Sequence, residues 1–204
     1  MVKGQADAAL LDSYEGERLP VAERLLETTD RGFRLAVSDS WLAGLFRTKI
    51  VARIAALAMT FERMQKLAFR AVSQTAIAYR NSALAKTLDG LPDSAPHAGD
   101  RFPWLKLKLG AGGPAEDFFE KFDDLGFDLF VFGQSLPAGA GAFGALTRVH
   151  VVPDDPANAA ALAQAGIVLP SFYLVRPDGY VGLCGSRFDA EAVRRYLSEN
   201  LRLA

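Results

Sequence analysis

The spacing of hydrophobic residues predicts helices in the first part of the chain. Apolar residues recur there at intervals typical of one helix face turned toward a core. This predicted face consists of Tyr14, Val21, Ala22, Leu25 and Leu26. A second helical region is predicted over residues 41–74, and we interpret its apolar positions as core as well.

Three local signals refine this helical part. Ser13 is the predicted N-cap of the first helix, because its hydroxyl can accept a hydrogen bond from a first-turn amide. Pro20 lies too deep in the helix to be a first-turn proline, so we expect a kink or a restart there. Residues 77–79 are predicted to form a short strand.

Strands and helices alternate in the second part of the chain. Glycine and proline concentrate between residues 90 and 113, which marks a boundary between a helical segment, residues 1–90, and a second domain, residues 91–204. The elements predicted beyond it are a helix at 114–125, strands at 127–132 and 147–152, a helix at 156–164, hairpin strands at 171–175 and 180–183 around the turn R-P-D-G, and a last helix that Asp189 caps.

This order of elements resembles that of a thioredoxin-type domain. Such folds place a proline, usually cis, just before the first hairpin strand, and Pro170 occupies that place. The cis or trans state of its peptide bond is left open. The predicted fold class is therefore α/β, with an N-terminal helical segment followed by a thioredoxin-like α/β domain.

Charge and composition exclude several functions. The 204 residues carry a net charge of −1 with scattered Lys and Arg, which argues against a partner such as nucleic acid or an anionic membrane. His97 and His150 lie far apart, and Cys184 is the single cysteine, so neither a disulfide nor a metal site is expected. No apolar signal core follows the first residues, and the most apolar stretch, residues 50–61, contains Arg53. We expect a cytoplasmic protein that does not span a membrane.

Thiol chemistry is poorly supported. Thioredoxin chemistry needs a low-pKa thiolate after the first strand, but the segment there begins Q-S-L-P and contains no cysteine. The domain is therefore predicted to be redox-inactive. Cys184 falls on or after the second hairpin strand, where a buried small hydrophobe is favoured over a redox thiol. A one-cysteine redox protein is the least favoured of three hypotheses.

The loop P-H-A-G-D-R-F-P-W is the best local candidate for a contact surface. It combines His97, Asp100, Arg101 and Trp104. The structural alternative is a loop pinned to the domain edge by Phe102 and Trp104, with Asp100 and Arg101 as a surface ion pair.

A glycine motif nearby is a weaker candidate. Gly139, Gly141 and Gly144 spell G-x-G-x-x-G, but the strand predicted from residue 147 leaves no room for the helix that a dinucleotide site needs. The residue twenty positions beyond Gly144 is Gln164 rather than an acidic residue. We interpret this segment as a loop.

Several segments, taken in order, resemble one enzyme family. They are L-L-D-S-Y-E-G-E-R-L-P-V-A from Leu10, Y-R-N-S-A-L from Tyr79, A-G-D-R-F-P-W-L from Ala98, F-D-L-F-V-F-G from Phe127 and F-Y-L-V-R-P-D-G-Y-V from Phe172. They are similar to the later part of FAD-dependent aromatic-ring hydroxylases, the phenol and polyketide hydroxylase type of flavin monooxygenase, which end in a thioredoxin-like domain. One departure is Leu183 and Cys184, which stand where the family usually has an aromatic residue and Arg.

The resemblance carries fold and kinship but no catalytic residue. The family binds FAD through an N-terminal G-x-G-x-x-G, a central Asp-Gly pair and a G-D-A-A-H segment, and none of these occurs here in the corresponding place. We therefore expect the C-terminal portion of such a monooxygenase, from a split or truncated gene. FAD and NAD(P)H are implied for the full enzyme, while this protein alone is expected to bind no cofactor and to be inactive.

Two partner hypotheses accompany this interpretation. The N-terminal helices are expected to bind a separate FAD-domain polypeptide or to form a homo-oligomer. The alternative function is a standalone, redox-inactive thioredoxin-like module for interaction or oligomerisation.

Overall fold

The computed structural model describes residues 8–37, the single positions 53, 57, 60, 61, 64 and 65, and residues 77–200 apart from 110–112, 123–124 and 138–142. The protein forms two compact units. One comprises the residues up to Tyr14 and from Ala78 onward, and the other comprises Glu15–Ile77. Each unit is described by itself.

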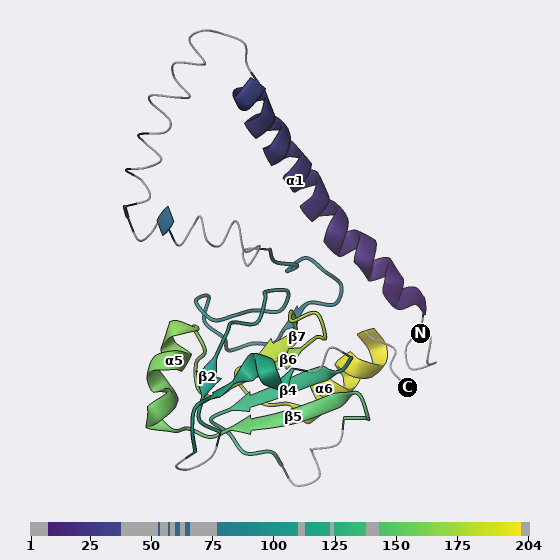
Figure 1. The fold of residues 1–204 in the computed structure, drawn as a ribbon. Helices are drawn as coiled ribbons and strands as arrows, with labels where there is room; N and C mark the ends of the chain where they lie inside the picture. Colours follow the sequence, from purple (N-terminus) through teal and green to yellow (C-terminus); the bar gives the residue numbers. More distant parts are fainter. Residues whose placement is uncertain are drawn as a thin grey trace. The chain divides into compact units, whose positions relative to one another are not determined.

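A long helix occupies most of the described residues 8–37 (Figure 1). A 3-10 turn, η1 (Ala8–Leu11), leads into α1 (Asp12–Val37). The helix runs continuously through Pro20, so the predicted restart is wrong. The Ser13 hydroxyl donates to the Leu10 carbonyl at 2.6 Å. Ser13 lies inside the helix and is not its N-cap, because η1 already begins the helical path upstream.

The predicted burial of the α1 apolar face is also wrong. The side chains of Tyr14, Leu25 and Leu26 are 65%, 61% and 66% exposed. Periodicity predicts that a helix has an apolar face, but it does not reveal whether the same polypeptide covers that face. The helix predicted at residues 41–74 falls almost wholly outside the described residues.

A five-stranded mixed sheet forms the C-terminal unit (Figure 1), and it confirms the α/β class. Its strands are β1 (Lys86–Thr87), β4 (Phe127–Phe132), β5 (Thr147–Val152), β6 (Ser171–Val175) and β7 (Val181–Gly185). Their order is β1-β7-β6-β4-β5; β4 is parallel to β5, β7 is parallel to β1, and β6 is antiparallel to both β4 and β7. The sheet thus includes Lys86 and Thr87, which the division at residue 90 assigns to the helical segment.

The strand predictions at 127–132, 147–152 and 171–175 are confirmed to the residue. Every residue of β4 and β6 is buried. Continuous burial follows from the position of these strands in the middle of the sheet, where side chains on both faces meet a core. The turn between β6 and β7 closes at Gly179, whose φ of +80° a residue with a side chain rarely adopts.

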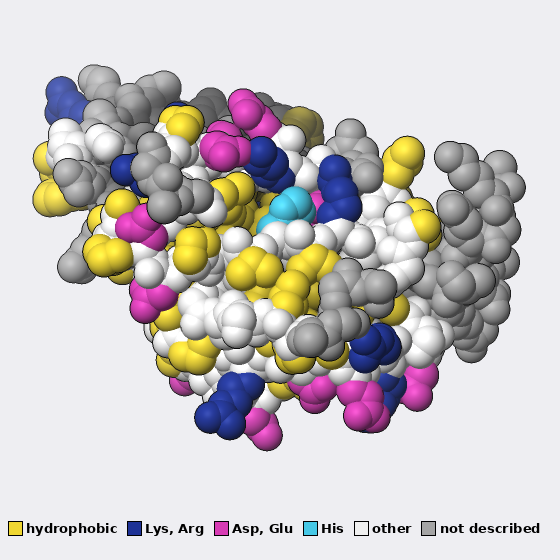
Figure 2. Space-filling model, turned by 90° about the horizontal axis from the view of Figure 1, so that it is seen from below, with side chains coloured by type: hydrophobic (Ala, Val, Ile, Leu, Met, Phe, Trp, Pro, Cys, Tyr) yellow, Lys and Arg dark blue, Asp and Glu magenta, His cyan; other side chains and the backbone are white. Residues whose placement is uncertain are grey.

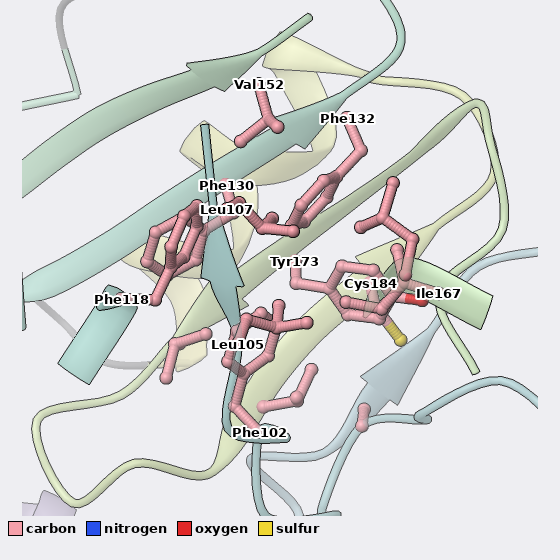
Figure 3. Close-up of a cluster of buried hydrophobic side chains, with 14 residues drawn as sticks. Phe102, Leu105, Leu107, Phe118, Phe130, Phe132, Val152, Ile167, Tyr173 and Cys184 are labelled. Atoms are coloured by element: carbon pink, nitrogen blue, oxygen red, sulfur yellow. The ribbon is translucent and has the colours of Figure 1, made fainter. Parts of the chain in front are cut away.

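Two hydrophobic clusters cover the two faces of the sheet. The first packs Phe118, Phe130 and Tyr173 with Leu162 of α5 (Ala159–Gln164). Figure 3 shows the labelled aromatic side chains of this cluster turned toward one another, with Cys184 beside Tyr173. The second cluster packs side chains of the opposite face against α6 (Ala190–Arg195) and the turn after it, η5 (Tyr196–Asn200).

The predicted helices are confirmed at 156–164 and at Asp189, with one change of detail. The first begins as a 3-10 turn, η4 (Pro156–Asn158), before α5. The Asp189 carboxylate accepts hydrogen bonds from the Glu191 and Ala192 amides, as an N-cap should.

Two other predictions are wrong. Residues 77–79 form no strand; instead the Tyr79 amide donates to the Gly99 carbonyl in a loop. In the segment predicted as a helix, β3 (Glu116–Asp117) pairs with β2 (Lys106–Leu107), and only a 3-10 turn, η3 (Phe118–Lys121), follows. The Asp117 carboxylate caps that turn by accepting a hydrogen bond from the Phe119 amide. The helical turn therefore begins at Phe118 and not at Pro114, where the predicted helix began.

Candidate functional site

The segment after β4, where the sequence-based interpretation looked for a thiol, contains a glutamine amide, Gln134. The Gln134 carboxamide donates to the Ser171 carbonyl at 3.1 Å and accepts from the Phe188 amide at 3.0 Å. The Leu169–Pro170 bond that precedes β6 is cis. Gln134 therefore ties β4 to the start of β6 and to the segment after β7, and a carboxamide held in this way cannot act as a nucleophile.

Cys184 lies on β7, in the core. Its thiol is fully buried, and Sγ donates to Thr87 Oγ1 at 3.6 Å. Burial raises the pKa of the thiol to about 11, because a low-dielectric surrounding disfavours the thiolate. At neutral pH the thiol is therefore protonated and shielded from solutes. An unreactive thiol of this kind is typical of a structural cysteine.

Part of the predicted contact loop comes together around Asp100. The Asp100 carboxylate accepts two hydrogen bonds from Arg80, both at 2.7 Å, and one from the His97 amide at 3.0 Å. Hydrogen bonding to this carboxylate raises the pKa of Arg80 above its ordinary value. The expected Asp100–Arg101 ion pair is wrong, because the fold brings Arg80 to Asp100 from 20 residues away.

The other members of this loop have different neighbours. The Arg101 guanidinium lies 6.0 Å from the Tyr180 ring centroid. The Trp104 indole donates to Asp117 Oδ2 at 2.9 Å, and its side chain is 63% exposed. Phe102 is buried and anchors the loop as expected, whereas Trp104 is mostly exposed and contacts the domain through its hydrogen bond to Asp117. His97, Asp100, Arg101 and Trp104 thus form no single convergent site.

Sequence reasoning missed a buried carboxylate with His and Arg neighbours near the other edge of the sheet. The Asp128 side chain is only 4% exposed; its Oδ1 lies 2.8 Å from His150 Nε2 and 3.3 Å from Arg148 Nε. The His150 ring stacks on Phe130, with centroids 4.8 Å apart. Asp128 interrupting an apolar strand was the available signal, since a buried carboxylate needs hydrogen-bonding partners.

Candidate metal ligands and surface charge were compared in the part of the protein that the structure describes. No three His, Cys, Asp or Glu side chains converge there as metal ligands. Figure 2 shows Lys and Arg interspersed with Asp, Glu and hydrophobic side chains on the face that it presents.

Among the described helices, none combines the length and hydrophobicity needed to cross a bilayer. Gly139 and Gly141 of the glycine motif lie outside the described residues.

The fold is shared with solved flavin enzymes. It matches OxyS, an anhydrotetracycline hydroxylase from Streptomyces rimosus, with a TM-score of 0.63 and 21% identity over 96% of this chain and 36% of that one. The flavin-dependent monooxygenase PieE, solved with FAD and substrate, matches with a TM-score of 0.61 and 20% identity over 98% and 41%. RebC-10x with bound 7-carboxy-K252c matches with a TM-score of 0.58 and 27% identity over 97% and 37%.

Other solved structures with this fold include CabE, an aromatic hydroxylase, and RebC with reduced flavin, and this chain spans only about two fifths or less of the length of these neighbours. No protein-family model and no curated protein sequence matches the chain.

Proposed function

We propose that this protein is the C-terminal portion of an FAD-dependent aromatic-compound monooxygenase and is not catalytic alone. The observation that carries the proposal is the alignment of nearly the whole chain with one part of such enzymes. The order of the motifs in the sequence, from L-L-D-S-Y-E-G-E-R to the R-P-D-G hairpin, supports the same kinship.

The C-terminal unit is proposed to be a thioredoxin-like module without thiol chemistry. The parallel β4–β5 pair, the antiparallel β6–β7 hairpin and the cis Pro170 ahead of β6 support a thioredoxin-like arrangement. The Gln134 amide at the end of β4 and the buried Cys184 support redox inactivity. The module then acts as a scaffold.

FAD and NAD(P)H belong, in this proposal, to a separate FAD-binding polypeptide. Tight FAD binding requires backbone amides that cradle the pyrophosphate at the start of a helix. In the described residues that follow β4, the next helical turn is η4, which comes after β5 rather than directly after a glycine-rich turn. The described residues that follow β4 therefore offer no such cradle, and no step of flavin chemistry is assigned to them.

The apolar face of α1 is the proposed contact with that FAD-binding polypeptide. Leu19, Leu25, Leu26 and Phe33 are each at least half exposed. Exposed clusters of large hydrophobic residues mark interaction sites in soluble proteins. The alternative partner for this face is a second copy of the protein, which would give a homo-oligomer. Cytoplasmic localisation stays a prediction.

The test is reconstitution with a polypeptide that carries the FAD-binding part of such an enzyme. Purified alone, this protein should be colourless and show no flavin absorbance. Mixed with the FAD-binding polypeptide it should co-migrate with flavin and support substrate-dependent NAD(P)H oxidation. A yellow preparation of the protein alone, or no binding to any FAD-binding partner, contradicts the proposal.

A matched pair of variants examines the α1 face. The double substitution Leu25→Glu, Leu26→Glu places two negative charges on the apolar face, whereas Arg24→Gln, Arg31→Gln changes the net charge by the same amount at exposed positions on the opposite side of the helix. Only the first should abolish complex formation. Equal effects of both would contradict docking through this face.

The alternative function is a standalone redox-inactive interaction module, which the same Gln134 and Cys184 geometry favours. It predicts a stable homo-oligomer that neither binds nor activates a flavin-carrying polypeptide. Light scattering together with the reconstitution assay separates the two functions.

A further inference from the structure

Strand β5 forms one edge of the five-stranded sheet. It pairs with β4 on one side, and no described strand pairs with its other side. The opposite edge is β1, which is only two residues long. β5 has six residues without an internal proline, and Val151 near its end is 42% exposed. A long, β-branched edge strand is a template for a further strand.

The hydrogen bonds to β4 establish which backbone groups of β5 face outward. The Phe127 amide donates to the Leu146 carbonyl and the Gly133 amide to the Val152 carbonyl. Because the backbone groups of successive residues point to opposite sides of a strand, even-numbered residues from 146 to 152 face β4, and Thr147, Val149 and Val151 face away. The Thr147 amide donates instead to the Gly144 carbonyl, so the Thr147 carbonyl is its outward group.

We propose that β5 pairs with β5 of a second copy of this protein, antiparallel about a two-fold axis at Val149. In this register each Val149 amide donates to the other copy's Val149 carbonyl. Each Val151 amide donates to the other copy's Thr147 carbonyl, which is the acceptor that Thr147 has left outward. The two sheets then join into one continuous sheet.

Self-complementarity is the reason for a second copy as the occupant. An isologous two-fold contact requires a pattern that meets itself when reversed. About Val149, the β-branched side chains of Thr147 and Val151 lie opposite each other on one face of the joined sheet. Cross-strand pairs of β-branched residues stabilise antiparallel strands.

The polar side chains of β5 are held toward the buried Asp128, although the Arg148 side chain is 47% exposed. Arg148 and His150 project on the other face, and both are drawn back to the buried Asp128, at 3.3 Å and 2.8 Å. Natural edge strands are usually protected by charges that reach into solvent along the edge. In the proposed register each Arg148 lies opposite the other copy's His150, and the Asp128 carboxylates of both copies balance the two guanidinium charges.

The test removes one outward amide and leaves the ladder to β4 intact. Val149→Pro deletes the outward N–H at a position where an edge strand tolerates proline, and Val149→Thr is the matched control that keeps it. Both are made in the Leu25→Glu, Leu26→Glu background, so that association through α1 does not contribute. Sedimentation equilibrium over serial dilutions should show a dimer for the parent and Val149→Thr, and a monomer for Val149→Pro.

Hydrogen exchange on the parent protein covers the case in which Val149→Pro fails to fold. The Val149 and Val151 amides should be protected at high concentration and lose that protection on dilution. The proposal would be overturned if the parent is monomeric or if the folded Val149→Pro variant is still dimeric. It would also be overturned if the protection of the Val149 and Val151 amides does not change with protein concentration. Protection that develops only when an FAD-binding polypeptide is added would also overturn it, in favour of a different strand. The proposal does not depend on the proposed function.

Discussion

At the scale of single residues, buried polar groups of this protein are held by specific partners. The Tyr196 hydroxyl is buried and donates to the Leu84 carbonyl at 2.6 Å, across 112 residues of sequence. Gly182 lies directly beneath the same ring, and a Cβ there would collide with the hydroxyl. Tyr196 and Gly182 are therefore coupled: the small residue makes room for the hydrogen-bonded large one.

A double-mutant cycle measures this coupling. Tyr196→Phe should lower the free energy of unfolding by about 1–2 kcal/mol, because the buried Leu84 carbonyl loses its donor. Gly182→Ala should cost about 1–3 kcal/mol through overpacking. The double variant should cost less than the sum, since the clashing oxygen is gone. Strict additivity in urea denaturation would contradict the contact.

Alkaline pH should destabilise the fold partly through Cys184. Its folded pKa, about 11, lies above the ordinary value of 9.0. The stabilisation is therefore complete below about pH 9 and is lost as pH rises toward 11, because the unfolded polypeptide releases its proton first. The difference in unfolding free energy between the parent and Cys184→Ala should shrink by up to about 2–3 kcal/mol between about pH 8 and about pH 11. A constant difference would show that the thiol is not buried in solution.

Residue-scale contacts were predictable only where they are local. Asp189 could be recognised as an N-cap because its partners lie two and three residues away. Arg80–Asp100 and Asp128–His150 depend on which loops and strands lie side by side, and residue spacing does not contain that information.

At the scale of elements, strong hydrophobic runs were predictable and short or capped pieces were not. β4 is continuous apolar sequence apart from Asp128, and its bounds follow from that. β1 has two residues, too few for any periodicity. The segment at 116–121 carries helix-start signals, but pairing of β3 with β2 overrides them. Short elements of this kind depend on specific hydrogen bonds between residues far apart in the sequence.

Asn158 makes two such long-range hydrogen bonds, both to the backbone of Lys108. It is almost fully buried; its amide donates to the Lys108 carbonyl at 2.9 Å, and its carbonyl accepts from the Lys108 amide at 2.8 Å. Asn158→Ala should cost about 2–4 kcal/mol, because both backbone groups of Lys108 lose their partner. Asp155→Ala is the control: it removes only the cap of η4 and should cost about 1 kcal/mol. Similar decreases in melting temperature for the two variants would contradict this role of the Asn158–Lys108 hydrogen bonds.

At the scale of the whole molecule, burial is concentrated in the middle of the sheet. β4 and β6 are buried throughout and pair on both sides, whereas β5 and β1 are edges. The sequence predicted this layered α/β core, since its strands are apolar runs. For α1 it left both a core face and a partner contact open, because amphipathicity specifies a face without identifying its neighbour.

Amide exchange should reproduce this gradient. The amides of β4 and β6 should exchange only through global unfolding, while those of β1, β2 and β3 should exchange faster through local opening. Mass spectrometry of peptides from each strand measures the order. Uniform protection across all strands would contradict a gradient set by burial and pairing.

The pairing of β1 with β7 also has a consequence for synthesis. Thr87 and Cys184 touch across 97 residues, and β6, which flanks β4, is made only shortly before β7. Contacts that close such long loops form late. On the ribosome β1 must therefore wait, unpaired, until β7 has emerged, 97 residues after Thr87.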